Sequence, residues 1–116
     1  MLGKEDHTPN QETGDDPCVV LCTGTAVDAE RISAAVIRES HAACVNIVPV
    51  TSCFIWEETV TRDEESLLII KTSRDRVDGL TSRICSLHSY DLPEVIVLPI
   101  VGGLPEYLDW VRGVGR

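Results

Sequence analysis

Three runs of consecutive apolar residues constrain most strongly how this chain can fold. They are VVLC at residues 19–22, LLII at 67–70 and VIVL at 95–98. Successive side chains of a strand point to opposite faces of a sheet, so a strand with one solvated face alternates apolar and polar residues. These runs do not alternate, and each is short and rich in β-branched residues. They therefore predict strands that need apolar cover on both faces.

The segments around these runs complete an α+β pattern. Thr25 and Asp28 have the spacing of a helix N-cap, and Pro49 cannot donate to a sheet ladder, so it marks an edge or a bulge. The charged segment 59–66 is predicted to be the turn of a hairpin. The predicted strands are 17–23, 44–58, 67–73 and 93–100, and the predicted helices are 25–43, 74–89 and 104–114. This β-α-β-β-α-β order, with an extra C-terminal helix, is typical of the ferredoxin-like sandwich.

A ferredoxin-like subunit has too few helices to cover both faces of the sheet that this sequence predicts. Two long helices and a short third one cannot cover both faces of a four-stranded sheet, yet the apolar runs require cover on both. A second copy of the chain can supply the missing apolar surface, as in obligate oligomers. The pattern alone therefore predicts a homo-oligomer with the second sheet face at its interface.

Length and composition fit one domain. The chain has 116 residues, of which 43% are apolar, which is enough for one core and too few for two. Residues 1–16 are polar and acidic and have no apolar stretch of a signal peptide, so we expect a disordered tail before a single domain at 17–116. No segment approaches the ~20 apolar residues of a membrane span. These features predict a cytoplasmic protein.

Charge and motifs exclude several functional classes. A formal net charge of −9 repels phosphate backbones and anionic membrane surfaces, which argues against nucleic-acid and membrane partners. The chain has no Gly-rich phosphate cradle, no G-x-S-x-G elbow and no H-E-x-x-H zinc motif. No nucleophile and base stand in a recognisable arrangement. We therefore expect a protein that is not an enzyme.

Thiol and imidazole side chains remain as candidate metal ligands. The five cysteines are expected to be free thiols, and Cys44, Cys53 and Cys85 to be small buried apolar residues. Cys22 lies four residues after Cys18 on the first strand, so both point to the same face. Thiolate and imidazole together suit Cu(I), Cu(II) or Zn(II).

The structural interpretation of the polar candidates stays open beside the functional one. His88, at the turn before the last strand, fits either a metal ligand or a packed residue that closes the turn. Lys71 directly follows an apolar run, which calls for a carboxylate partner such as Glu65 or Glu94.

Four segments in order carry a resemblance to a known family. They are AACVNIVPVTSCFIWE at 42–57, EESLLIIKT at 64–72, HSYDLPEVIVLPI at 88–100 and YLDW at 107–110. Together they resemble the CutA family of divalent-cation tolerance proteins, over about residues 17–112. The resemblance implies a ferredoxin-like subunit in a homotrimer whose sheets face inward. It also implies a role in tolerance of copper and other divalent metal ions.

The resemblance also implies candidate binding residues. Copper-binding members use a Cys near the end of the first strand and two adjacent histidines; Cys22 and His88 match two of these, and Leu87 replaces the third. The implied ligand is copper, as Cu(II) or Cu(I), with no cofactor required for folding. As an alternative, the similarity of the family to PII signalling trimers implies a small-molecule cleft between subunits. The candidate cleft residues are Trp56, Glu65, Lys71 and Tyr107.

Overall fold

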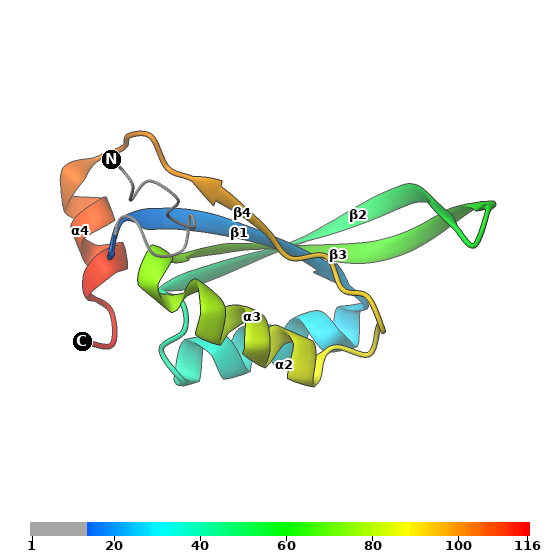
Figure 1. Cartoon of the computed structure of the whole chain (residues 1–116), viewed down its shortest axis with the longest axis horizontal. Helices are drawn as coiled ribbons and strands as arrows, with labels where there is room; N and C mark the ends of the chain where they lie inside the picture. The colour runs from blue at the N-terminus through cyan, green and yellow to red at the C-terminus, as the bar shows by residue number, and fades with distance from the viewer. Residues whose placement is uncertain (1–13) are drawn as a thin grey trace, which may run out of the picture.

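A computed structural model describes residues 14–116 (Figure 1). The strands are β1 (Pro17–Gly24), β2 (Cys44–Trp56), β3 (Thr59–Ser73) and β4 (Ile96–Pro99), and the helices are α2 (Ala26–Arg38), α3 (Val77–Leu87) and α4 (Pro105–Gly113), with a single 3-10 turn η2 (Arg74–Arg76). This order confirms the predicted α+β arrangement with an additional C-terminal helix. No helix of the described residues is long and apolar enough to cross a membrane.

The strands form one antiparallel sheet in the order β2-β3-β1-β4. Figure 1 shows α2 and α3 side by side on one face of this sheet, α4 at the end where β1 begins, and the β2–β3 hairpin projecting beyond the helices at the other end. Pro49 lies in β2, which is an edge strand as predicted. Thr25 caps α2, because its Oγ1 accepts a hydrogen bond from the Asp28 N–H at 3.1 Å.

The core lies between the sheet and the two long helices. On β1 every second residue is fully buried against the helices, beginning with Cys18, Val20 and Cys22. Leu68 and Ile70 of β3 join them on the same face. The helical side of the core consists of Ala29, Ile32 and Val36 from α2 and Val77, Leu80 and Ile84 from α3.

The other face of the sheet, here called the open face, is also apolar. Leu21 pairs with Ile69 on one side and Ile96 on the other, and Val19 pairs with Leu98. Ile96 and Leu98 are 46% and 42% exposed, because both long helices pack on the opposite face. The apolar runs thus supply two apolar faces, of which the subunit's own long helices cover one.

The hairpin differs from the sequence prediction. Residues 59–66 were predicted to form a turn, but they belong to β3, which pairs with β2 from Thr59 to Lys71. The turn is only Glu57–Glu58, both with positive φ (50° and 67°). The prediction was wrong because both faces of the projecting hairpin tolerate charged residues, so no apolar alternation marks the strand.

Two smaller predictions concern the cysteines and the tail. Cys44 is half-buried and Cys53 and Cys85 are exposed, so the expectation that these three are buried was wrong for this subunit. Cys53 lies on the projecting hairpin and Cys85 on the outer side of α3, where no core covers them. Most of the predicted tail lies outside the described residues. Its last residues are exposed, and the Asp16 carbonyl accepts a hydrogen bond from the Arg74 N–H at 2.8 Å.

Candidate functional site

His88 is a buried anchor of the turn between α3 and β4. It follows the last residue of α3, where its N–H donates to the Ile84 carbonyl. Its side chain is 0% exposed. Nδ1 accepts the Tyr90 N–H at 3.1 Å, so Nε2 carries the proton and donates to the Thr23 carbonyl at 2.8 Å. Both ring nitrogens are therefore used in hydrogen bonds that tie the turn to the end of β1.

Asp28 reinforces the same turn from α2. Its carboxylate is almost completely buried and accepts hydrogen bonds from the N–H and the hydroxyl of Ser89. Burial opposes the charge, but the two Ser89 hydrogen bonds, with His88 and Arg31 nearby, outweigh it and lower the pKa of Asp28. The turn is thus fixed at both His88 and Ser89.

Cys22 lies next to the same carbonyl. It is fully buried, and its Sγ lies 3.7 Å from the Thr23 oxygen that also accepts from His88. Burial, followed by the charge of Glu94, raises the pKa of the Cys22 thiol to about 12. Burial likewise raises the pKa of Cys18, which lies farther along the same face of β1. Both sulfurs are therefore protonated near neutral pH.

The two predicted ligands approach one another but do not form a ready metal site. A metal needs the Cys22 thiolate and a free nitrogen of His88, whereas the structure has a thiol and a fully hydrogen-bonded ring. Among residues 14–116, no group of three or more His, Cys, Asp or Glu side chains could hold a metal ion. Ligation by Cys22 and His88 stays a prediction, and it requires His88 to give up one hydrogen bond.

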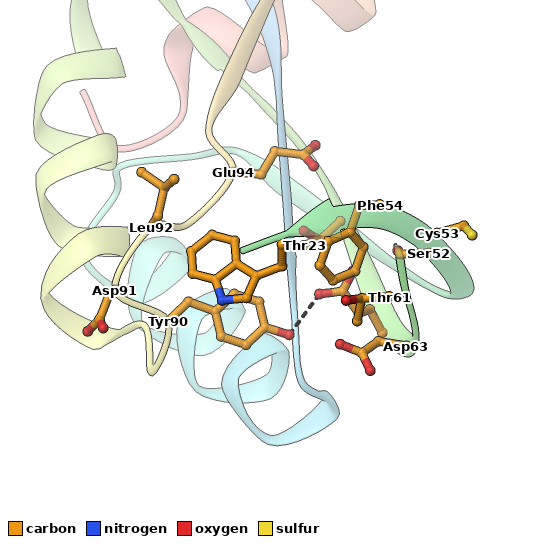
Figure 2. Close-up of a pocket in the computed structure, with 12 residues that line it drawn as sticks. Thr23, Ser52, Cys53, Phe54, Thr61, Asp63, Tyr90, Asp91, Leu92 and Glu94 are labelled. Carbon is orange, nitrogen blue, oxygen red and sulfur yellow. Dashed lines mark hydrogen bonds between the residues drawn. The ribbon is translucent and has the colours of Figure 1, made fainter. Parts of the chain in front are cut away.

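A pocket of about 680 Å³ lies between the β2–β3 hairpin and the α3–β4 turn (Figure 2). The Tyr90 hydroxyl crosses from the turn to the hairpin and donates to Glu65 Oε2 at 2.7 Å. Desolvation and the neighbouring Glu65 carboxylate raise the pKa of Tyr90, so it remains a donor. The lining residues are Thr23, Ser52, Cys53, Phe54, Trp56, Thr61, Asp63, Glu65, Tyr90, Asp91, Leu92 and Glu94.

The four predicted cleft residues fall in two places. Trp56 and Glu65 line the pocket. Lys71 lies at the other end of β3, six residues or roughly 20 Å from Glu65. It is opposite Cys44, and Tyr107 lies near Cys44. One subunit therefore does not bring the four together.

The partner of Lys71 also differs from the prediction. Its Nζ contacts the side-chain oxygen of Asn46, the diagonal neighbour on β2, and not Glu65 or Glu94. The ammonium group is on the open face, where it is only half-buried, so an amide oxygen is sufficient as a partner.

Most of the pocket was not predicted from the sequence. Ser52, Phe54 and Trp56 recur with a period of two on β2, opposite Asp63, Thr61 and Thr59 of β3. This period places them on one face of the hairpin. This period of two is visible in the sequence, but it was not used because residues 59–66 were assigned to a turn and not to the partner strand.

The fold and its open apolar face define a class of small α+β proteins with a four-stranded antiparallel sheet, to which PII-like proteins belong. The model of the family described as CutA1 divalent ion tolerance protein matches residues 18–114. The chain belongs to this family.

Solved structures support the same assignment. A crystal structure of CutA1 from Oryza sativa is similar with a TM-score of 0.84 and 43% identity, over 90% of this chain and 98% of that one. The apo form of a protein described as PII-like protein CutA, from a Nostoc species, has a TM-score of 0.79 and 36% identity, over 83% and 94% of the two chains.

Curated relatives differ in length. The divalent-cation tolerance protein CutA of Thermus thermophilus is 45% identical over 81% of this chain and 93% of its own. A chloroplastic CutA of Oryza sativa is 48% identical over 75% of this chain and 50% of its own. The chain thus spans about half the length of the plant relatives that it matches.

Proposed function

We propose that this chain is a non-enzymatic protein of divalent-metal tolerance that acts as a homotrimer. The observation that carries the trimer is the open face of the sheet. Val19, Leu21, Ile69, Ile96 and Leu98 form apolar rows that α2 and α3 do not cover, and copies of the same surface can bury them. The family supplies the link to divalent ions.

Sedimentation equilibrium tests the trimer. At micromolar concentration we expect a mass of about three times the 12.7 kDa of one chain. A mass of one chain under these conditions would contradict both the trimer and the role assigned to the open face.

Copper is the metal that we propose, with Cys22 and His88 as its ligands. Thiolate and imidazole suit copper by their chemistry, and both side chains adjoin the Thr23 carbonyl. Calorimetric titration should show binding that Cys22→Ser or His88→Ala weakens by about tenfold or more (~1.4 kcal/mol).

The matched control for the titration is Cys85→Ser, which removes an exposed thiol outside the turn. Copper binding that ignores Cys22→Ser and His88→Ala would show that these two residues are not the ligands.

The cytoplasm is the compartment that we propose. The names of relatives include chloroplastic and periplasmic proteins, so the compartment varies within the family. Fractionation of the source cells, with antibodies against this chain, tests the proposal, and recovery from a membrane-enclosed compartment would contradict it.

A second candidate function is the binding of a small molecule. The observation that favours it is the pocket between the hairpin and the α3–β4 turn, which combines three aromatic rings with hydroxyl and carboxylate groups. The similarity of the chain to a protein described as PII-like also supports this function. A protein that only binds metal would show no saturable binding of small molecules at Phe54, Trp56 or Tyr90.

A further inference from the structure

The pocket between the hairpin and the α3–β4 turn is strongly acidic. Its lining contains four carboxylate side chains and no Lys, Arg or His. Asp63 and Glu65 come from β3, whereas Asp91 and Glu94 come from the turn. Two walls that are separate in sequence thus contribute the same sign of charge. Such a cleft concentrates cations and repels anions.

Aromatic rings supply the apolar part of the same pocket. Phe54 and Trp56 lie two residues apart on one face of β2 and are 38% and 48% exposed. Tyr90 faces them from the turn, with its hydroxyl fixed on Glu65. In Figure 2 the rings of Phe54 and Tyr90 lie near Asp63, while Cys53 points away on the outer side of the hairpin. The faces of such rings attract cations.

The arrangement of the carboxylates distinguishes between kinds of cation. A bare divalent ion needs several oxygen ligands converging on one point within about 2.6 Å. No group of three acidic, Cys or His side chains within residues 14–116 converges in this way. Carboxylates spread around aromatic rings instead suit a ligand whose positive charge is attached to an apolar body. A pocket of about 680 Å³ has room for such a molecule.

We propose that this pocket binds a small organic cation, an ammonium group carrying an apolar or aromatic substituent. The charge lies near Asp63 and Glu65, and the substituent packs against Phe54, Trp56 and Tyr90. The proposal rests on the second candidate function, small-molecule binding, and not on the copper site. Asp63 and Glu65 lie on the same side of β3 as Ile69, so the pocket borders the open face.

Benzylammonium and benzyl alcohol are suitable probes, because they share an aromatic body and differ in charge. The full chain with Trp110→Phe leaves Trp56 as its only tryptophan, so its fluorescence reports on the pocket. We expect saturable binding of benzylammonium that is about fivefold or more tighter than that of benzyl alcohol. The difference should shrink as salt is added.

Pairs of variants at neighbouring positions test which side chains bind the cation. In the Trp110→Phe background, Asp63→Asn and Glu65→Gln should each weaken benzylammonium binding by about threefold or more. Glu64→Gln, between them on β3, should leave binding unchanged, because Glu64 faces away from the pocket and bonds to Thr51. In the same way Phe54→Leu should weaken binding and Ile55→Leu should not, because neighbouring residues of β2 face opposite sides.

Three results would overturn the proposal. Equal affinity for both probes would keep a small-molecule pocket but reject the cationic ligand. No saturable change up to about 10 mM of either probe would reject both the ligand class and the small-molecule function. If neither probe binds and Asp63→Asn dissociates the oligomer, the pocket receives a basic side chain of a second copy. Sedimentation and copper titration on the same samples report on the trimer and the metal separately.

Discussion

At the scale of the residue, His88 decides how the turn before β4 is built. Its ring donates a hydrogen bond to the Thr23 carbonyl and accepts one from the Tyr90 N–H, so it links the turn to the end of β1. Any metal bound there competes with these two hydrogen bonds. The His88 side chain therefore stabilises the turn, and metal binding by His88 would break at least one of its hydrogen bonds.

His88→Ala should lower the free energy of unfolding by about 2–4 kcal/mol, because it removes a buried ring and leaves two backbone groups without a partner. Denaturant unfolding at a fixed protein concentration measures this. The control is His41→Ala, whose side chain is 28% exposed and should cost less than about 1 kcal/mol. Equal losses in the two variants would contradict the anchoring role of His88.

Asp28 makes stability depend on pH in the acid range. Its folded pKa is lower than the value of about 3.9 in an unfolded chain. Its contribution to stability is therefore complete above about pH 4 and is lost as the pH falls through the folded pKa. Unfolding measured between neutral and acid pH should show this decline, and Asp28→Asn should reduce it. Glu30→Gln, an exposed change on the same helix, is the control; a decline unchanged by Asp28→Asn would contradict the assignment.

At the scale of the element, the turn of the β2–β3 hairpin has an unfavourable backbone conformation. Its two-residue turn places Glu57 and Glu58 in the left-handed region, which costs a non-glycine residue about 1 kcal/mol or more. Asn and Gly are the residues that such hairpin turns favour. The two adjacent carboxylates also repel each other.

The double change Glu57→Asn/Glu58→Gly should raise the free energy of unfolding by about 1 kcal/mol, because it relieves the backbone cost. Denaturant unfolding measures the gain. The control Glu57→Gln/Glu58→Gln removes only the charges and should give a smaller gain. Equal gains would mean that repulsion, and not backbone conformation, limits the turn.

Helices and strands could be predicted from the sequence where one buried face gives a periodic pattern of apolar residues. The N-cap of α2 followed from Thr25 and Asp28, and the edge position of β2 from Pro49. The extent of β3 did not, because its first residues are exposed on both faces and carry charges. The pocket was out of reach for another reason: Tyr90 and Glu65 are 25 residues apart and meet only once the turn folds back over the sheet.

At the scale of the whole molecule, the two faces of the sheet differ in what covers them. The continuous apolar runs predicted cover on both faces, and the structure assigns one face to α2 and α3. Sequence could not show where Cys22 and His88 meet, since their shared contact is a backbone carbonyl that no side-chain pattern reveals.

Leu98→Glu should dissociate the proposed trimer. The side chain is 42% exposed in one subunit, so a carboxylate costs the monomer little, whereas in a trimer it would be buried without a partner. Sedimentation should show the mass of one chain. Val27→Glu, at a position on α2 that is 69% exposed, is the control and should leave the trimer intact. A Leu98→Glu protein that remains trimeric would place the interface elsewhere.

The close approach of Gly24 to His88 links the pocket to a residue outside its lining. A Cβ at position 24 would lie 3.2 Å from His88 Nε2, and His88 in turn holds the backbone of Tyr90. A methyl group added at position 24 would therefore push on the ring that positions a wall of the pocket. Two descendants of one ancestor could keep every lining residue and still diverge in ligand preference through a change at this single position. Inheritance of the binding property would then have to be traced through Gly24 and His88 as well as through the residues that contact a ligand.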